Sequence, residues 1–492
     1  MALPAPPESS LFVTRVRELI ARTPLTCPGT LSALQVARLL STEGVGSVVV
    51  CDDLGAPAGI VTDRDLRRKV VAEGRDPATL PAHAIMSAPL IAVPPTAFAF
   101  EAILEMTRWA IHHLAVVEAG RLVGILSTYD LLRLQASHPV TLAREIGRAT
   151  SLESLVDLAR RVTPLVRQLV DAGGTAYDIG QLVAELNDRL VQRVLGLAAD
   201  ELAATGATPP VPFCWLVLGS EARREQTLRT DQDNGLVYAD PPPEQAGQAT
   251  AYYAKLCEAA IQGLIAIGFP ACPGNLMASN PEWRQPLSVW SGYFRRWITE
   301  AWPAQAAFAV VMFDLRPVAG DRRLTEALLT TIRTEVAENR AFLSVLAREA
   351  ISDESPVTLW GKIVVERRGP HRGAVDVKRA GGQQLVGAGR VHALDFGLAD
   401  LNTLDRIRAA ARLGVYTDGE LRDIADAYQF LMRLRLSHQL MLLERGASPD
   451  NWINPTQLAR ADAALLREAL CTVEHVKVTV RKRYGLGRLP GI

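Results

Sequence analysis

The sequence predicts a mixed α/β fold: a doubled small α/β unit, then a second α/β core flanked by helical regions. Three observations support this prediction. An eight-residue motif at 59–66 recurs at 124–131, an offset of 65 residues. An apolar run at 213–218 indicates a buried strand and is followed by Gly-Ser and an Asp-x-Asp pair. From about residue 322 onward, apolar residues mostly recur at helical spacing.

Composition narrows the class of protein. The length of 492 residues suggests two to four domains. Lysine plus arginine and aspartate plus glutamate number 53 each, so the net charge is zero, which disfavours nucleic acid as a partner. Six scattered cysteines without a Cys-x-x-Cys pair disfavour a disulfide framework or a zinc site. With no signal peptide and no long apolar run, we expect a cytoplasmic protein without a membrane partner.

Changes in composition and periodicity divide the chain into five predicted segments. They are a flexible tail at 1–10, the doubled unit at 11–140 with copies at 18–80 and 81–138, a helical connector at 141–208, the second α/β core at 209–330, and a helical C-terminal domain at 331–492.

Each copy of the doubled unit has the same predicted order of elements. An amphipathic helix, near 31–43 or 97–109, precedes a short apolar strand at 47–50 or 114–117. A turn and the repeated motif follow. Such a duplication implies two copies that pack about a pseudo-twofold axis.

The repeated motif resembles the end of a CBS domain, a small α/β module that commonly pairs and binds adenosine nucleotides. The resemblance implies that Thr62 and Ser127 touch phosphate and that Asp65 and Asp130 bind ribose hydroxyls. It also implies a homodimer, because CBS pairs often associate through their helices. In the alternative interpretation, the two aspartates only cap the helices that follow them.

The most informative stretch of the second core follows the strand at 213–218. Gly219 and Ser220 break this strand, and the N–H groups of a helix start suit a phosphate. Asp231 and Asp233 are two positions apart, so on a strand they share one face and could hold Mg²⁺. The alternative is a solvated turn without catalytic meaning.

A third acid completes the predicted metal site. The apolar run at 308–313 predicts another core strand, which Asp314 interrupts. A carboxylate at the end of a core strand is costly unless it is paired or binds a metal. We therefore expect Asp231, Asp233 and Asp314 to form a metal triad.

Helices are predicted for most of the remaining chain. Their ranges are 179–197, 244–267, 402–414, 418–443 and 457–484, with a short strand or loop at 371–379. The aromatic residues between Trp283 and Trp302 are expected mainly to pack helices together, although a single ring could instead stack on a nucleotide base.

The run GSEARREQTLRTDQDNGLVY at 219–238 resembles the motif of PII-uridylyltransferase-like domains, which occur joined to CBS pairs in bacterial signalling proteins and belong to the polymerase-β superfamily. Segments 272–290, 313–321, 375–378 and 406–421 share this resemblance. The sequence departs from the family pattern at Ala222, where glycine is usual.

The resemblance assigns roles to individual residues. It implies that Gly219 and Ser220 hold a triphosphate, that Asp231 and Asp233 ligate Mg²⁺, and that Asp314 is the third acid that activates the attacking hydroxyl. In addition, Arg223 and Lys378 are implied phosphate contacts and Glu225 a local support.

These observations predict a Mg²⁺-dependent nucleotidyltransferase in signal transduction. It would transfer a uridylyl or adenylyl group from a nucleoside triphosphate to an acceptor, expected to be a protein. An adenosine nucleotide at the CBS pair would regulate it. The alternative is a catalytically inactive protein that senses nucleotides and serves as a scaffold.

Overall fold

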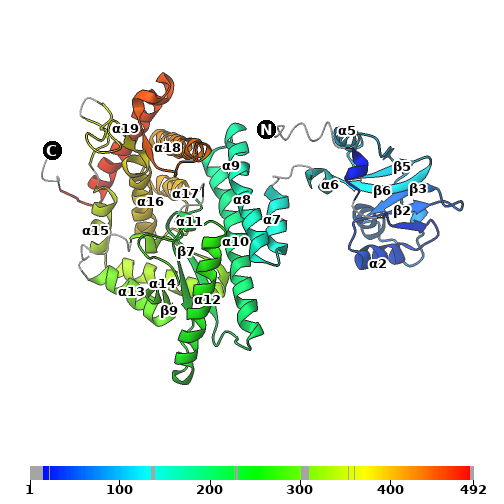
Figure 1. Cartoon of the computed structure of the whole chain (residues 1–492), viewed down its shortest axis with the longest axis horizontal. Helices are drawn as coiled ribbons and strands as arrows, with labels where there is room; N and C mark the ends of the chain where they lie inside the picture. Colours follow the sequence, from blue (N-terminus) through cyan, green and yellow to red (C-terminus); the bar gives the residue numbers. More distant parts are fainter. Residues whose placement is uncertain are drawn as a thin grey trace. The chain divides into compact units, whose positions relative to one another are not determined.

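The computed structural model describes residues 15–20, 23–133, 139–226, 228, 231–300, 310–352, 354–358 and 361–487. The chain divides into two compact units, an N-terminal unit, Met1–Thr141, and a C-terminal unit, Leu142–Ile492 (Figure 1).

The N-terminal unit contains two three-stranded sheets with the same topology. In each sheet the first two strands are parallel and the last two antiparallel, with a register shift in the antiparallel pair. The strands are β1 (Thr26–Pro28), β2 (Ser47–Cys51) and β3 (Pro57–Thr62), then β4 (Ala92–Val93), β5 (His113–Glu118) and β6 (Arg121–Ser127). The predicted internal duplication is therefore confirmed.

Helices accompany each sheet. The longer ones are α2 (Ala33–Glu43) and α5 (Ala99–Trp109), and the short ones are η1 (Val16–Glu18), α3 (Asp63–Leu66), η2 (Arg67–Val71), α4 (Ala82–Ile85) and α6 (Thr128–Arg133). Local sequence sets the ends of α2. Ser32 and Gln35 form a capping box at its start, and Gly44 ends it in the left-handed conformation.

The C-terminal unit is organised around a four-stranded sheet in the order β10-β7-β8-β9. The strands are β7 (Phe213–Leu218), β8 (Asn234–Tyr238), β9 (Arg284–Pro286) and β10 (Leu315–Gly320). Strand β7 is antiparallel to both β8 and β10. Its C-terminal end therefore lies beside the N-terminal ends of these two neighbours, and the segments that precede β8 and β10 meet the segment that follows β7.

The strand predicted at 308–313 is wrong. Residues 308–309 lie outside the described residues, 310–313 form a 3-10 turn, and the strand begins only after Asp314. Met312 and Phe313 are buried. A short apolar run indicates burial, but it does not distinguish a strand from a buried turn.

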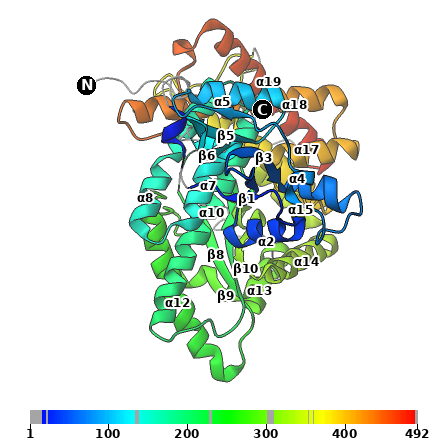
Figure 2. The ribbon, with the colours of Figure 1, turned by 90° about the vertical axis from the view of Figure 1, so that its right-hand side faces the viewer.

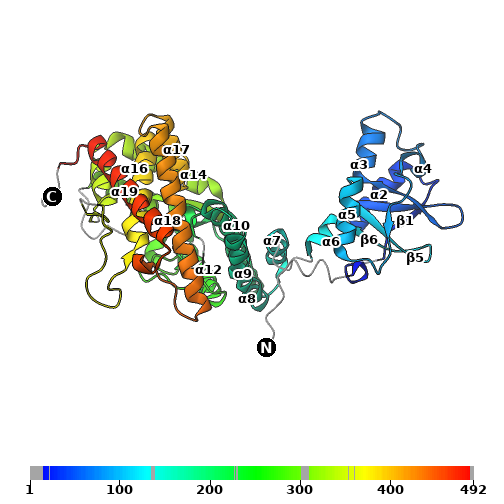
Figure 3. The ribbon, with the colours of Figure 1, turned by 90° about the horizontal axis from the view of Figure 1, so that it is seen from above.

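Helices surround the sheet and form most of the C-terminal unit (Figures 2 and 3). They are α7 (Pro139–Arg148), α8 (Leu152–Arg160), α9 (Val162–Asp171), α10 (Ala176–Ala204), α11 (Gly219–Ala222), α12 (Ala246–Ala266), α13 (Leu287–Thr299), α14 (Arg322–Glu338), α15 (Ala341–Ala350), α16 (Gln383–Phe396), α17 (Thr403–Arg412), α18 (Asp418–Glu444) and α19 (Arg460–Arg483). The short elements are η3 (Pro243–Gln245), η4 (Pro281–Trp283), η6 (Lys378–Gly382), η7 (Pro455–Gln457) and the paired strands β11 (Val375–Asp376) and β12 (Trp452–Ile453).

Helix α10 packs against α12, α18 and strand β10, so the predicted connector is part of the C-terminal unit. Asp188 on α10 accepts two hydrogen bonds from Arg316 on β10, at 2.7 and 2.8 Å. Helices α18 and α19 lie side by side in Figure 3 and contact each other.

The aromatic stretch after β8 packs the core, as predicted. Trp283 and Trp290 are 2% and 0% exposed, and their rings contact each other and Tyr293. Trp302 lies outside the described residues. Since both buried tryptophans are enclosed by protein, neither offers a face on which a base could stack.

Candidate functional site

The edge of the sheet where β7 ends is shaped by Gly219. Its φ is +57°, in the left-handed region that favours glycine. A Cβ atom there would lie 2.9 Å from Val311 Cγ1 and 3.4 Å from Asp233 Oδ2. The N–H of Gly219 donates to the backbone oxygen of Asp314 at 3.0 Å. No larger residue could occupy this position without moving the cavity wall.

The predicted helix start after Gly219 is a single turn, α11. Ala222, which replaces the usual glycine, lies within this turn and is 1% exposed. Alanine suits helical backbone, so this departure from the family pattern leaves the turn intact. Ser220 lines a cavity at this edge.

Asp231 and Asp233 precede β8 rather than lying within it, but the alternation on which their prediction depends still holds. Gln232, which separates them, is 1% exposed and points into the protein, where its Nε2 donates to Phe269 O at 3.1 Å. Asn234 donates to Gln232 Oε1 at 3.0 Å. Because Gln232 and Asn234 are held inward, the two carboxylates face the cavity, which both of them line.

Cys272 lies beside the two carboxylates. One ligand atom from each of Asp231, Asp233 and Cys272 lies within 4.8 Å of the others. Burial, and then the negative charge of Asp231, raise the pKa of Asp233, although a hydrogen bond with Cys272 partly opposes them. Burial and the hydrogen bond to Asp233 raise the pKa of the Cys272 thiol to about 11. The thiol is therefore neutral near pH 7.

Sequence reasoning missed Cys272, although it opens a segment that carries the family resemblance. Ala271 forms an isolated parallel bridge with Gln232, which brings the loop after α12 beside the Asp-x-Asp pair. This contact is between distant parts of the chain, so no local pattern indicates it.

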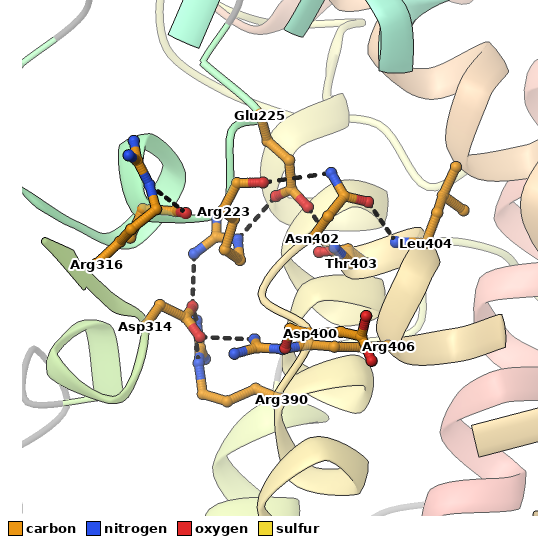
Figure 4. A network of polar contacts seen from close by, with 11 residues as sticks. Arg223, Glu225, Asp314, Arg316, Arg390, Asp400, Asn402, Thr403, Leu404 and Arg406 are labelled. Atoms are coloured by element: carbon orange, nitrogen blue, oxygen red, sulfur yellow. Dashed lines mark hydrogen bonds and ion pairs between the residues drawn. The ribbon is translucent and has the colours of Figure 1, made fainter. Parts of the chain in front are cut away.

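Asp314, the third acid of the predicted metal site, has different partners in this structure. Its backbone lies at the expected edge, and its fully buried carboxylate contacts three arginines (Figure 4). Oδ2 accepts from Arg223 Nη1 at 2.6 Å and from Arg390 Nη2 at 2.6 Å, and Oδ1 accepts from Arg406 Nη1 at 2.6 Å. Asp314 is not part of the group that Cys272 completes.

The charge state of Asp314 also disfavours its predicted role as a base. Burial by itself would raise the pKa of this carboxyl, but the three arginines outweigh burial and hold the pKa well below its usual range. Both oxygens already accept hydrogen bonds. A carboxylate in this state has little tendency to take a proton from an attacking hydroxyl.

Arg223 and Glu225 form a second layer around Asp314. Arg223 Nε donates to Glu225 Oε2 at 2.7 Å, and the other oxygen of Glu225 accepts from the backbone N–H of Thr403 at 2.6 Å. Asn402 donates to the backbone oxygen of Arg223 at 3.3 Å. Glu225 thus supports Arg223, as expected, and ties it to α17.

A cavity of about 370 Å³ opens at this edge. It is lined by Gly219, Ser220, Arg223, Glu225, Asp231, Asp233, Val310, Val311, Glu349, Ala350, Ser352, Val377, Lys378, Arg379, Gly382, Gln383, Gln384, Val386, Gly387, Arg390, Tyr428, Leu431, Met432 and Arg435. The predicted Lys378 is among them, and desolvation together with the charge of Arg435 lowers its pKa. Glu349, Arg390 and Arg435 were not predicted, because nothing in the sequence near them resembles a motif.

In the N-terminal unit, Thr62 and Asp65 form a capping box at the start of α3. Asp65 Oδ2 accepts from the hydroxyl of Thr62 at 2.7 Å. Its other oxygen, Oδ1, is 3.0 Å from Ser87 Oγ and 2.9 Å from Lys69 Nζ. Asp65 is 8% exposed, and both of its oxygens are engaged.

The second copy differs from the first at the equivalent acid. Asp130 Oδ2 accepts from the hydroxyl and the N–H of Ser127, at 2.6 and 2.9 Å. Within the described ranges, Asp130 Oδ1 has no hydrogen-bond or ion-pair partner. Each aspartate thus forms a reciprocal capping pair with the Thr or Ser three residues earlier, inside a helix that begins at Asp63 or Thr128 rather than after the aspartate. Among the described residues, only Asp130 keeps an oxygen without a partner.

Comparisons with known families agree with the division into an N-terminal and a C-terminal unit. The family described as "Putative nucleotidyltransferase DUF294" matches residues 160–304, and that described as "Putative nucleotidyltransferase substrate binding domain" matches 340–484. The CBS domain family matches at 16–72 and again at 82–137. The chain joins a CBS domain pair to the two DUF294 domains. The combination predicted from the sequence is confirmed.

Individual relatives match mainly in one part of the chain. An uncharacterized protein of Methanopyrus kandleri is 34% identical over 134 residues, which are 27% of this chain and 68% of that protein. Inosine-5'-monophosphate dehydrogenase of Mycobacterium leprae is 30% identical over 196 residues, 37% of this chain and 36% of that enzyme. The chain thus spans from about a third to about two thirds of the length of these relatives.

Among solved structures, a CBS domain protein from Pyrobaculum aerophilum complexed with AMP is 33% identical. The match covers 25% of this chain and 99% of that chain, with a TM-score of 0.23. A signal-transduction protein with CBS domains from Burkholderia ambifaria is 31% identical over 24% of this chain and 92% of its own, with a TM-score of 0.24.

The cavity combines residues of both DUF294 domains. The first domain supplies Gly219, Arg223 and the Asp-x-Asp pair, and the second supplies Lys378 and Arg390. Asp314 lies in the segment that joins them. Within the described part of the chain, no helix has both the length and the apolar character of a membrane span.

Proposed function

We propose that the DUF294 domains form a Mg²⁺-dependent nucleotidyltransferase that moves a uridylyl or adenylyl group from a nucleoside triphosphate to a hydroxyl of an acceptor protein. The observation that carries this proposal is the convergence of Asp231 and Asp233 with the Gly219–Ser220 turn in one cavity that also contains cationic side chains. Carboxylates that bind a metal, together with cations that bind phosphates, match the charge pattern of a nucleoside triphosphate with its cation.

The residues present fit Mg²⁺. Two carboxylates lie close together and repel each other, and the cavity leaves room for waters and phosphate oxygens, which Mg²⁺ keeps as ligands. The neutral thiol of Cys272 is a poor ligand for so hard a cation. Bound at Asp231 and Asp233, Mg²⁺ would neutralise the charge that develops on the reacting phosphate oxygens.

The reaction requires an in-line displacement at the α-phosphorus. The acceptor oxygen forms a bond to this phosphorus while the bond to the β-phosphate bridging oxygen breaks, and pyrophosphate leaves as the hydroxyl proton passes to solvent. Gly219 and Ser220 hold the phosphates close to Asp231 and Asp233 through the turn after β7. The contribution of the chain is therefore positioning and electrostatic stabilisation.

Asp231→Ala tests the catalytic site. The variant should lose Mg²⁺-dependent transfer by about 10²-fold or more, because it removes half of the carboxylate pair. The measurement is incorporation of label from radioactive UTP or ATP into protein in a cell extract. Asp200→Ala, which changes an exposed acid on α10, is the control and should retain full activity. Retained transfer in Asp231→Ala would refute this site.

A second candidate function has a specific observation in its favour. Asp314, which resembles the third acid of active relatives, is locked to arginines. A protein that binds nucleotides without transferring them would tolerate such an arrangement. Absence of transfer with every triphosphate, combined with measurable Mg²⁺-dependent binding of one of them, would support this sensing and scaffold role.

We further propose that the CBS pair binds an adenosine nucleotide and regulates the transferase in signal transduction. Asp130 Oδ1, which has no partner among the residues that the structure describes, can accept from a ribose hydroxyl, whereas Asp65 would first have to release Lys69 or Ser87. The second copy is therefore the stronger candidate for the ribose contact.

A further inference from the structure

Two buried arginines from different DUF294 domains line the cavity as neighbours. Arg223 and Arg390 are 8% and 6% exposed, and both belong to the cavity wall. Both donate to the same atom, Oδ2 of Asp314, at 2.6 Å. Figure 4 shows the two guanidinium groups turned toward this shared carboxylate.

Each of these arginines keeps one terminal nitrogen unused. Arg223 donates through Nε and Nη1, and Arg390 donates through Nε and Nη2. Over the described residues, Nη2 of Arg223 and Nη1 of Arg390 have no acceptor in the protein. Both side chains line the cavity, where a ligand could supply the missing acceptors.

The charge around these arginines is unbalanced. Three arginines, at 223, 390 and 406, face two carboxylates, Asp314 and Glu225. Arg406 is not in the cavity wall, so the excess positive charge is presented by the other two. Lys378 and Arg435 add cations to the same wall.

We propose that Arg223 and Arg390, aligned by Asp314, form a polyphosphate-binding site. This inference rests on the proposed function, because the ligand is the triphosphate end of the nucleotide donor. Guanidinium groups match phosphate oxygens in geometry and form charge-assisted hydrogen bonds with them. The site needs both DUF294 domains, since each supplies one arginine.

Asp314 acts in this site as a positioning residue. Its carboxylate holds the two like charges side by side and fixes the direction of their remaining N–H groups. Without that shared acceptor, two adjacent guanidinium groups would repel each other. The acid that resembles a catalytic group thus acts through the arginines rather than on the reacting atoms.

Binding of inorganic tripolyphosphate to the full chain tests the site, measured by calorimetry in EDTA so that no divalent cation contributes. Arg390→Gln should weaken binding by about tenfold or more. Arg390→Lys keeps the positive charge, but its single ammonium group cannot make the bidentate contact with Asp314 and bind the ligand at the same time. It should therefore recover only part of the affinity. Arg340→Gln, which removes an arginine paired with Asp395 outside the cavity wall, is the matched control and should bind like the unchanged chain.

The outcomes separate this site from the proposed transfer. If Arg390→Gln and Arg390→Lys both bind tripolyphosphate as tightly as Arg340→Gln, the arginine site is refuted even if the chain transfers nucleotides. If Arg390→Gln does not fold, unchanged affinity in Arg390→Lys has the same meaning. Asp231→Ala should still bind tripolyphosphate in EDTA, so its loss of transfer would report on the metal site alone.

Discussion

At the scale of single residues, Glu221 carries the most unusual charge state near the site. It lies on α11 next to Ser220 and is 4% exposed, and its Oε1 has no hydrogen-bond partner in the described structure. Burial, and then the nearby Asp188, raise the pKa of Glu221 to about 8. The charge of Arg316, which is paired with Asp188, offsets only part of this increase. Glu221 is therefore mostly protonated at pH 7.

This charge state predicts how stability depends on pH. Between about pH 4.5 and 8 the folded state keeps the proton of Glu221 while the unfolded state loses it, so the free energy of unfolding falls as pH rises, by at most about 1.4 kcal/mol per pH unit from this group. Glu221→Gln keeps the shape without the titration and should flatten this slope. Urea denaturation at a series of pH values measures it.

The control for that experiment is Glu326→Gln on the exposed face of α14, which should leave the slope unchanged. An equal decline with pH in Glu221→Gln and in the unchanged chain would mean that Glu221 is ionised in the folded protein. The prediction would then be wrong.

Some residues of the site could be predicted from sequence, and others could not. The spacing of Asp231 and Asp233 was enough to predict that their side chains share one face of the chain, because this alternation depends only on neighbouring residues. The arginine partners of Asp314 could not be predicted, because two of them lie far along the chain, on α16 and α17. Cys272 was missed for the same reason. Long-range contacts decide the direction of such side chains, and a single sequence does not contain them.

At the scale of elements, the fold was predicted best where a pattern repeats. The duplicated strands and the long helix α12 follow from periodicity, and α18 follows from periodicity and the capping box at its start. The beginning of β10 did not follow, because a buried 3-10 turn and a buried strand have the same apolar composition. The ends of β7, β8 and β10 meet at one edge of the sheet because of how these strands pair, and the apolar pattern does not predict which strands pair.

The two capping boxes of the CBS pair predict different effects for equivalent substitutions. Asp130→Ala should weaken binding of AMP to the full chain by about tenfold, because it removes the available oxygen along with the cap. Asp65→Ala should mainly reduce the free energy of unfolding of the pair, by about 1–2 kcal/mol, through the loss of its cap and its buried contacts. Calorimetry with AMP and thermal unfolding distinguish the two effects.

Thr417→Ala, which removes a capping box at the start of α18 in the other unit, provides a control for cap loss alone. Its AMP affinity should not change. The reverse pattern, with AMP binding abolished only by Asp65→Ala, would show that the ribose contact lies in the first copy.

At the scale of the whole molecule, two compact units share one chain. If the CBS pair regulates the transferase, AMP must change the affinity of the C-terminal unit for polyphosphate, and polyphosphate must change the affinity for AMP by the same factor. We expect a factor of about five or more in both directions. Calorimetric titration of each ligand with and without the other measures it.

Asp130→Ala should raise the AMP concentration needed for this coupling by about tenfold, while leaving the affinity for tripolyphosphate of the chain without AMP unchanged. Equal affinities with and without AMP, in a chain that binds both ligands, would instead mean that the two units are only covalently joined.

The shared carboxylate of Asp314 also limits how the catalytic core can be exchanged between proteins. A graft that carries the sheet but not α16 and α17 would leave a buried negative charge with only the guanidinium of Arg223 opposite it. Recombination between relatives should therefore succeed when the breakpoint lies outside the pair of domains, and fail when it falls between them.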